Sequence, residues 1–372
     1  MDISLKMQVP YFDLKRQYQT ISEQVNESIQ EVIKNTAFAG GRFTASFETA
    51  FAKYCQTDYA IGVNSGTSAL HLAMLAIGIG EGDEIILPAN TFIATAWGPA
   101  YVNAKCVFVD CDETYNIDPT KVEAAITERT KAIVGVHLYG QPCDVDALKA
   151  IAEKHNLFFM EDAAQAHGAY YKGTRVGGFG EMACFSFYPG KNLGAYGEGG
   201  GVTTNNEAYR DHLFRLRNHG CEVRYYHKEI GYNMRMDGIQ GAVLEVKLAH
   251  LDKWNERRRQ IAHRYQTEIK HADVRLPIVS QDVEGVFHLY VVTVPDRAHF
   301  QAYLKEQGVS TALHYPVPCH LQEAFVDLGY KKGDFPNAEY LSDHCVSLPM
   351  FAELTEEEVS YTIAMINAYP GK

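Results

Sequence analysis

The stretch 157–201 brings together side-chain types that could form a reactive site. One apolar run ends in Glu161 and Asp162, and a second apolar run leads into a tight turn that carries Lys191. Five glycines follow this lysine between positions 194 and 201. Carboxylates that end an apolar strand are typical of α/β proteins, which bind ligands beyond the carboxyl ends of parallel strands. The lysine amine could therefore act as a nucleophile beside a carboxylate.

These residue types match what pyridoxal 5'-phosphate (PLP) needs from a protein. The cofactor needs an amine for its aldehyde, a carboxylate for its ring nitrogen and donors for its phosphate. Lys191, Asp162 and Ser186 could fill these roles, and the glycines would let the backbone approach a flat ring. Taken singly, the lysine could be a solvated surface charge and the aspartate a helix cap. The combination predicts a Schiff-base lysine and a PLP site.

A second polar segment, 64–68, joins a predicted strand to a predicted helix. The first N–H groups of a helix have no internal partner and favour anions, so this segment could bind a phosphate. A simple Ser or Thr N-cap explains the same pattern. Phe92, just after another strand, could stack on a pyridine ring, although such aromatic residues usually belong to the core.

Two familiar motifs do not fit. Residues 186–191 end in Gly-Lys like a P-loop, but the leading glycine is missing and Asn192 replaces the Ser or Thr that would hold magnesium. Residues 62–66 resemble a nucleophile elbow, but their spacing is not Gly-x-Ser-x-Gly. We expect neither a nucleoside-triphosphate site nor a metal site.

The composition is that of an ordinary globular protein. The chain has 372 residues, 46% hydrophobic and 22% charged, which is enough for a substantial core and more than one domain. Its net charge of −12 argues against binding to nucleic acid or to a membrane surface. We see neither an apolar run long enough to span a bilayer nor a signal peptide. The eight cysteines form no C-x-x-C pair, so reduced thiols and a cytoplasmic location are expected.

From residue 59 onward, short apolar segments alternate with helix-length segments, which predicts β-α units and a mostly parallel sheet covered on both faces. The expected strands are Tyr59–Val63, Glu84–Leu87, Lys105–Val109, Ala132–His137 and Leu157–Met160. The expected helices between them are Thr67–Ile77, Pro119–Thr127 and Val145–His155. Polar clusters follow several of these strands, which places the site at one edge of the sheet.

The last third of the chain changes character. A long helical pattern runs from residue 239 to about 270, and we interpret its charged cluster 256–259 as a solvated face. A strand at 288–294, a helix at 298–307 and a strand at 309–314 are expected next. We predict a large PLP-binding domain, 1–250, and a small C-terminal α+β domain, 251–372. Thr20 with Glu23 is expected to form a capping box, and Thr355-Glu-Glu-Glu is expected to cap a final helix that runs to about residue 368.

The chain resembles the sugar aminotransferases of the DegT/DnrJ/EryC1/StrS family, which are PLP enzymes of fold type I. The resemblance covers nearly the whole chain. It is carried by Asn64-Ser-Gly-Thr-Ser-Ala-Leu, Pro88-Ala-Asn-Thr-Phe-Ile-Ala-Thr, Glu161-Asp-Ala-Ala-Gln-Ala-His-Gly and Phe185-Ser-Phe-Tyr-Pro-Gly-Lys-Asn-Leu-Gly. Later matches are Glu198-Gly-Gly, Arg217-Asn-His-Gly, Gly231-Tyr-Asn-Met-Arg-Met and Tyr315-Pro-Val-Pro-Cys-His-Leu-Gln.

The resemblance implies roles for individual residues. Lys191 would be the catalytic residue that bonds to the cofactor, and family members that dehydrate sugars carry histidine there, so lysine favours transamination. The cofactor would be held by Gly66, Thr67, Phe92, Asp162, Gln165, Ser186 and Asn233. Asp162 would contact the ring nitrogen and Gln165 the phenolic oxygen, while Gly66, Thr67 and Ser186 would bind the phosphate. Asn233 would reach the phosphate from a second subunit, so a homodimer would share its active sites.

The resemblance also implies the substrates. L-glutamate would donate the amino group, leaving pyridoxamine 5'-phosphate (PMP) on the enzyme, and a nucleotide-linked keto-sugar would accept it. The His314-Tyr315 pair looks like that of enzymes that aminate carbon 3 of dTDP-3-keto-6-deoxyhexoses. The candidate substrate contacts are Tyr188, Arg224, His314, Tyr315 and His320, although the histidines could serve only loop hydrogen bonds.

Several alternatives remain open at this point. The acceptor could be a 4-keto sugar, a UDP- or GDP-linked sugar or an aminocyclitol precursor. The glycan or antibiotic pathway to which the product belongs is also open. From a different class, the chain could be a non-catalytic regulator that binds PLP or a nucleotide sugar.

Overall fold

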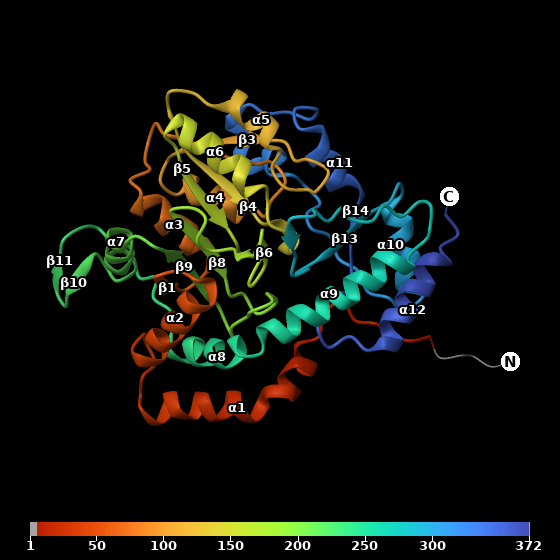
Figure 1. Ribbon diagram of the computed structural model, residues 1–372, viewed down its shortest axis with the longest axis horizontal. Helices are drawn as coiled ribbons and strands as arrows, with labels where there is room; N and C mark the ends of the chain where they lie inside the picture. Colours follow the sequence, from red (N-terminus) through yellow and green to blue (C-terminus); the bar gives the residue numbers. More distant parts are fainter. Residues whose placement is uncertain (1–5, 372) are drawn as a thin grey trace.

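A computed structural model describes residues 6–371. At its centre is a seven-stranded sheet with the order β1-β9-β8-β5-β4-β2-β3, in which β9 alone of the seven strands runs antiparallel. The strands are β1 (Tyr59–Val63), β2 (Glu84–Pro88), β3 (Lys105–Val109), β4 (Thr130–Val136), β5 (Phe158–Asp162), β8 (Met182–Ser186) and β9 (Gly200–Thr204). Figure 1 shows helices packed around this sheet. The predicted α/β class with a mostly parallel sheet is confirmed.

The sheet is buried on both faces, because successive residues of a strand point to opposite sides. In β2, Ile85 and Leu87 belong to one core cluster and Ile86 to another. The first face is covered by α3 (Gly66–Ala76), α4 (Ala94–Ala100) and α7 (Glu207–Arg217). The other is covered by α2 (Arg42–Cys55), α5 (Pro119–Val122), α6 (Val145–His155) and α8 (Gly238–Leu248).

Helix α1 (Leu14–Lys34) begins earlier than the sequence pattern indicated. Asp13 caps it by accepting hydrogen bonds from N–H groups of its first turn. Thr20 lies inside the helix and donates its hydroxyl proton to a backbone carbonyl one turn earlier, so the capping box predicted there is wrong. Thr355 caps α12 (Glu356–Asn367) as predicted, and it does so in a capping box with Glu358.

The long helical pattern from residue 239 to about 270 corresponds to two helices, α8 and α9 (Leu251–Glu268). The chain turns between them at Ala249 and His250. In Figure 1, α9 leads away from α8 and the sheet toward the carboxyl-terminal elements. Helix α9 therefore connects the region of the sheet to the carboxyl-terminal elements.

A second core cluster lies at the far end of α9. It is formed with α10 (Arg297–Glu306), α12, β13 (Tyr290–Thr293) and β14 (Cys345–Leu348). Val9, from the amino-terminal segment, also packs into it. Helix α11 (Pro336–His344) instead packs on the sheet cluster that contains Ile85 and Leu87. The boundary expected near residue 250 coincides with the turn between α8 and α9. The division into domains 1–250 and 251–372 stays a prediction.

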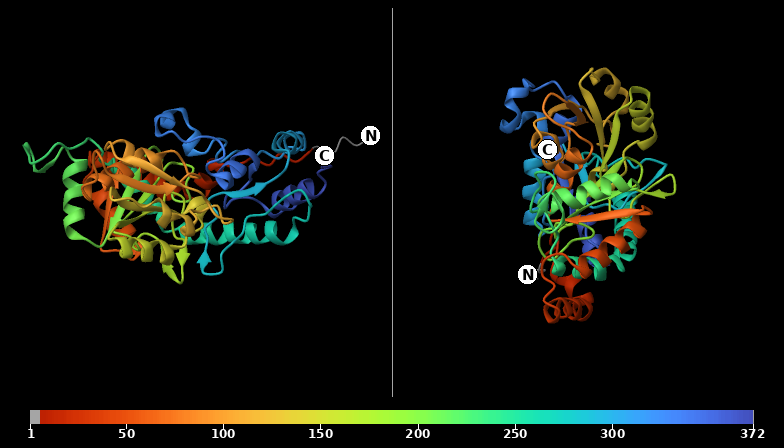
Figure 2. Two further views of the ribbon diagram at one scale, coloured as in Figure 1. Left: turned by 90° about the horizontal axis from the view of Figure 1, so that it is seen from above. Right: turned by 90° about the vertical axis from the view of Figure 1, so that its left-hand side faces the viewer.

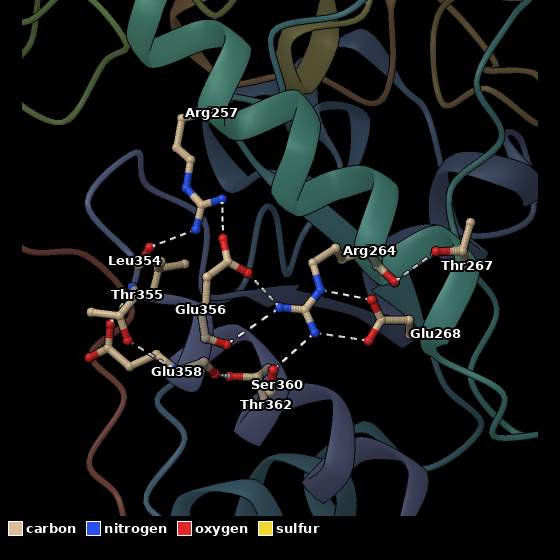
Figure 3. Close-up of polar contacts among 10 residues, drawn as sticks. All are labelled: Arg257, Arg264, Thr267, Glu268, Leu354, Thr355, Glu356, Glu358, Ser360 and Thr362. Atoms are coloured by element: carbon tan, nitrogen blue, oxygen red, sulfur yellow. Dashed lines mark hydrogen bonds and ion pairs between the residues drawn. The ribbon is translucent and has the colours of Figure 1, made fainter.

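Arginines of α9 hold this end of the helix to α12 (Figure 3). Arg264 pairs with Glu268 on its own helix at 2.7 Å and with Glu356 of α12 at 2.8 Å. Arg257 also reaches Glu356, at 2.6 Å, and donates to the carbonyl of Leu354. The Glu356 side chain is 60% exposed, so water screens these pairs and each contributes about 1 kcal/mol or less. The apolar cluster beneath them supplies more of the stability.

Short elements complete the fold. The expected strand at 309–314 is wrong, because only single bridges to Val9 and Ser347 form there. The remaining strands are β6 (Tyr170–Tyr171), β7 (Thr174–Arg175), β12 (Val283–Glu284), β10 (Cys221–Val223) and β11 (Tyr226–His227). The 3-10 turns are Glu123–Ala125, Leu138–Gly140, Cys319–Leu321 and Glu323–Leu328. The hairpin β10–β11 projects from the body of the molecule (Figure 2).

Candidate active site

A cavity of about 650 Å³ lies at the carboxyl ends of the parallel strands. Its wall includes the ends of β4, β5 and β8, the start of α3, and residues from α9 and the segment before β13. This volume is that of a small-molecule site, and its place at the sheet edge is the one that α/β topology favours.

Lys191 lies in this cavity on the turn that follows β8. The backbone N–H of Lys191 donates a hydrogen bond to the backbone carbonyl of Tyr188 at 2.8 Å, which closes the turn. Gly194 is required there, because a Cβ at this position would lie 2.3 Å from the carbonyl oxygen of Pro189. The amine of Lys191 has no hydrogen-bond partner within residues 6–371. Burial lowers its pKa to about 8, and the charge of Asp162 opposes this shift.

Asp162 is the last residue of β5, and only 5% of it is exposed. The Oδ2 atom accepts a hydrogen bond from the hydroxyl of Thr95 at 2.7 Å, and Oδ1 accepts one from the N–H of Ala164 at 3.1 Å. Burial raises the pKa of this carboxyl, while these hydrogen bonds and the charge of Lys191 lower it. The carboxylate is therefore held in one orientation at the cavity wall.

The start of α3 forms a cradle for an anion. Ser65 caps the helix by accepting the N–H of Ser68 at 3.1 Å, so the ordinary N-cap is present. The N–H groups of Gly66 and Thr67 lie before the first helical hydrogen bond and line the cavity with Ser186. A Cβ at Gly66 would lie 2.6 Å from the Cβ of Ser186, so only glycine fits. These donors suit a phosphate.

Gln165 connects the sheet edge to the 314–315 loop. Its Oε1 atom accepts the N–H of Tyr139 at 2.6 Å, and its Nε2 atom donates to the hydroxyl of Tyr315 at 2.9 Å. Because Oε1 faces an N–H group, the orientation of the amide is fixed. Phe92 lines the same cavity, is 48% exposed, and is tilted against Tyr315 with ring centres 5.4 Å apart.

Tyr188 and His314 also line the cavity, as expected for substrate contacts. The Nδ1 atom of His314 lies 2.8 Å from the hydroxyl of Ser347, and Tyr11 stacks on its ring. Burial lowers the pKa of His314 to about 4, and the charge of Lys191 adds to this shift. The ring is therefore neutral at physiological pH.

Three predicted site residues lie outside this cavity. Arg224 and Asn233 are exposed, the first on the projecting hairpin and the second just after it. His320 is 2% exposed, and its Nε2 atom lies 3.0 Å from Glu339. The structure does not bring His320 to this cavity, because its buried contact with Glu339 holds it in the 319–344 segment. Its place in the structure is that of a packing residue.

The structure also adds residues that the sequence pattern missed, including Tyr11, Glu198, Arg258 and His288. Arg258 corrects the interpretation of cluster 256–259 as solvated, because only 4% of it is exposed. Its guanidinium donates to three backbone carbonyls, those of Phe287, His288 and Met350. Its helical spacing with Trp254 and Ile261, which are also buried, is the signal that could have revealed it.

Other kinds of site are not found in the described residues. No group of three or more His, Cys, Asp or Glu side chains within residues 6–371 could hold a metal ion. All eight cysteines lie in this range and have free thiols. No helix in the same range has the length and apolar character to cross a membrane.

A model of the DegT/DnrJ/EryC1/StrS aminotransferase family matches residues 19–367. The chain belongs to this family. The likeness is close: a "pleiotropic regulatory protein" of Geobacillus stearothermophilus is 46% identical over 97% of this chain and 98% of its own length. The dTDP-3-amino-3,6-dideoxy-α-D-galactopyranose transaminase of Aneurinibacillus thermoaerophilus is 44% identical over 97% of this chain and 99% of its own length.

Solved structures of this aminotransferase family have the same fold. DesV of S. venezuelae, in complex with a ketimine intermediate, has a TM-score of 0.96 and 41% identity over 97% of this chain and 98% of its own. NtdA of Bacillus subtilis, with the bound cofactor PMP, has a TM-score of 0.91 and 29% identity over 99% of this chain and 86% of its own. The predicted family, fold and enzyme class, an aminotransferase, are confirmed.

Proposed function

We propose that this aminotransferase uses PLP to transfer the amino group of L-glutamate to a nucleotide-linked keto-sugar. We further propose that the acceptor is a dTDP-3-keto-6-deoxyhexose and that the product is the 3-amino sugar. The observation that carries the chemistry is the unpaired amine of Lys191, in one cavity with the carboxylate of Asp162 and the start of α3. The observation that supports the substrate is the 44% identical relative, which is named for a dTDP-3-amino sugar.

The cavity fits the proposed cofactor. Lys191 provides an amine for the aldehyde, Asp162 a buried carboxylate for the ring nitrogen, and Phe92 an apolar face for the ring. The N–H groups of Gly66 and Thr67 and the hydroxyl of Ser186 supply phosphate donors. We assign Gln165 to the phenolic oxygen, for which its Nε2 atom would leave or share the contact with Tyr315. When bound, PLP supplies an electron sink and a carrier for the amino group.

The protein residues then have defined tasks. Lys191 would hold the cofactor through its amine and, when that amine is free, would move the proton at the substrate carbon that bears nitrogen. A pKa of about 8 leaves a sizeable neutral fraction of this amine near pH 8, so it can accept a proton there. The carboxylate of Asp162 would keep a proton on the ring nitrogen of the bound cofactor. In the second half-reaction, with the keto-sugar, the same residues act in reverse order.

The sugar would lie between Tyr188 and the 314–315 loop. These side chains line the cavity, and the neutral ring of His314 is suited to hydrogen bonds with sugar hydroxyls. Incubation of the protein with glutamate and a panel of nucleotide keto-sugars, with NMR of the products, tests this assignment. Amination at carbon 3 of the dTDP-3-keto sugar supports it, and preference for a 4-keto, UDP-linked, GDP-linked or aminocyclitol substrate rejects it.

We also propose a homodimer with shared active sites. Asn233 and Arg224 are exposed and lie outside the cavity of their own chain, on or beside the projecting hairpin. Tyr225 and Tyr226 on this hairpin are 75% and 74% exposed, which is unusual for side chains with so much apolar surface. Contact with a second subunit would bury them and bring Asn233 and Arg224 to the neighbouring cavity.

A second candidate function is regulation without turnover. It is favoured by the relative that is named a pleiotropic regulatory protein. A simple experiment distinguishes the two functions. A purified protein that is yellow with PLP and loses this colour with glutamate is a working aminotransferase. A protein that keeps its colour with glutamate, or never takes up PLP, would favour the regulator.

A further inference from the structure

Arg258 is a buried cation in the wall of the cavity, and the proposed function gives it no role. It lies in α9, and only 4% of it is exposed. Its Nη1 atom donates to the backbone carbonyls of His288 at 3.3 Å and Met350 at 2.9 Å, and both of these residues also line the cavity. The guanidinium is therefore anchored to the backbone of the cavity wall.

These hydrogen bonds use only one end of the guanidinium. The contact with the carbonyl of Phe287, at 3.1 Å, is also made by Nη1. The Nε atom is buried without a hydrogen-bond partner, and Nη2 has no partner within residues 6–371. An arginine side chain has N–H donors and no acceptor, and its planar fork matches a carboxylate better than any other common anion except phosphate. The unpaired donors of Arg258 therefore suit an anionic acceptor in the cavity.

The charge of Arg258 is poorly balanced by the protein. The side chain forms no ion pair within residues 6–371. Burial lowers its pKa to about 10, and the charge of Glu353 opposes this shift. Glu353 also acts on Lys247, a second buried cation, and burial raises the pKa of Glu353 itself. Arg258 is therefore protonated at physiological pH, and a buried charge of this kind favours an anionic partner.

The other charges of the cavity leave Arg258 available for a substrate. In the part of the chain that the structure describes, Lys191 and Arg258 are the only Lys or Arg side chains in the cavity wall. The amine of Lys191 is assigned to the aldehyde of the cofactor. The phosphate of the cofactor has its own donors at the start of α3, on a different wall element from α9. A further anion in this cavity would therefore meet Arg258.

We propose that Arg258 binds a carboxylate of the amino donor, L-glutamate. Glutamate is the proposed substrate that brings small, planar anions into the cavity, whereas the sugar ring itself is uncharged. The backbone contacts hold the guanidinium in place beforehand, so that little freedom is lost when a carboxylate binds. This inference rests on the proposed function and adds to it the residue that selects the donor.

Glutarate tests the contact without any chemistry, because it has both carboxylates of glutamate and no amine. Its affinity for the PLP-loaded protein is measured by calorimetry. Arg258→Gln keeps N–H donors for the wall carbonyls but loses the charge, and we expect it to weaken glutarate binding by roughly 10- to 100-fold. Arg257→Gln is the matched control: its guanidinium lies outside the cavity and pairs with the exposed Glu356, so glutarate should bind normally. Normal glutarate binding in Arg258→Gln would overturn the proposal.

The glutamate half-reaction separates substrate binding from packing. In single-turnover absorbance, Arg258→Gln should raise the glutamate concentration that gives half the limiting rate by a similar factor, and Arg258→Lys should recover part of this loss. A residue needed only for packing would leave this concentration unchanged, and that result would contradict the proposal. Glutamine and isoglutamine, each lacking one carboxylate, show which of the two Arg258 binds. The amide that is least affected by Arg258→Gln lacks that carboxylate, and equal losses for glutamate and both amides would also contradict the proposal.

The diphosphate of the nucleotide sugar is the competing anion. The affinities of dTDP, UDP and GDP should be the same in Arg258→Gln as in the unaltered protein. Weaker nucleotide binding with normal glutarate binding would assign Arg258 to the diphosphate and overturn the proposal.

Two further results keep the test decisive. Should Arg258→Gln fail to fold, a crystal structure of the unaltered protein with glutarate decides: a carboxylate within hydrogen-bond distance of the guanidinium supports the proposal, and glutarate bound elsewhere overturns it. If the unaltered protein does not react with glutamate at all, the proposed function fails and this inference fails with it. If the protein reacts and Arg258→Gln reacts equally well at low glutamate, only this inference fails.

Discussion

Lys191 and Asp162 share a cavity in which burial disfavours the charge on each of them. Burial lowers the pKa of Lys191 to about 8 and raises that of Asp162, while each charge opposes the shift of the other group. The lysine can therefore exchange a proton near physiological pH, as a group that is both nucleophile and base must do.

Replacement of Asp162 by asparagine tests its role at the residue scale. The Asp162→Asn side chain keeps the size of the original but not the charge that holds a proton on the ring nitrogen. We expect the rate of the glutamate half-reaction to fall by about 10²-fold or more, with the fold retained. Single-turnover absorbance measures this rate. Asp58→Asn, at an exposed position far from Asp162 in the sequence, is the control and should react normally. A near-normal rate for Asp162→Asn would contradict the assignment.

Residues at strand ends could be placed from the sequence, because the sheet brings its carboxyl ends to one edge. Lys191, Asp162 and Gly66 all line the cavity for this reason. Arg258 and His288 could not be placed, because their positions depend on how α9 and β13 pack with each other and with distant segments. Side chains that reach the site through tertiary contacts leave no pattern in a single local segment.

At the scale of elements, the turn after β8 fixes the direction of Lys191. Gly194 lies so close to Pro189 in this turn that an added Cβ would come within 2.3 Å of the proline carbonyl oxygen. We expect Gly194→Ala to distort this turn and weaken PLP binding by at least about 10-fold, measured by absorbance titration. Gly80→Ala, where a Cβ would meet open space, is the control and should bind PLP normally. Normal PLP affinity in Gly194→Ala would show that the turn does not position the lysine.

The two threonines expected to begin helices provide a matched pair. Thr355 caps α12, so Thr355→Ala should lower the free energy of unfolding by about 1 kcal/mol. Thr20 lies inside α1, where alanine is a better helix former, so Thr20→Ala should leave stability unchanged or slightly higher. Urea unfolding followed by circular dichroism measures both. Equal losses in the two variants would contradict the capping geometry.

Elements buried on both faces were predicted well, since their apolar runs are set by the strand itself. β1 and β3 occur at their predicted bounds, and β2, β4 and β5 differ from them by one or two residues. The strand expected at 309–314 failed because its partners, Val9 and Ser347, come from distant segments and form only single bridges. The prediction of a single long helix failed because a turn of two residues at 249–250 leaves little trace in a periodic pattern.

At the scale of the whole molecule, residues of the sheet core such as Val136 and residues of the cluster at the far end of α9 such as Met350 line one cavity. Residues from the sheet edge and residues from α9 and the 314–315 loop face each other across it. The sequence predicted two domains but not the exchange of segments between them. Val9 packs with β13 and β14, whereas α11 packs on the core of the sheet. Such exchanges depend on long-range packing and have no local signature.

Shared active sites can be tested by mixing two inactive variants. Lys191→Ala removes the amine, and Asn233→Ala removes the residue proposed to reach the neighbouring subunit. A mixed dimer contains one site with both changes and one site with neither, so refolding the two proteins together should restore activity. Each variant refolded alone is the control and should stay inactive. No recovery, in mixtures shown to contain mixed dimers, would mean that Asn233 serves its own chain or no site.

The most direct measurement asks where PLP bonds to the protein. The protein is incubated with PLP, reduced with borohydride and digested, and the modified peptide is identified by mass spectrometry. We predict a single stable pyridoxyl group on the side chain of Lys191, and none there in Lys191→Ala. A label on another lysine, or no label in protein that is otherwise folded, would contradict the central role given to this residue.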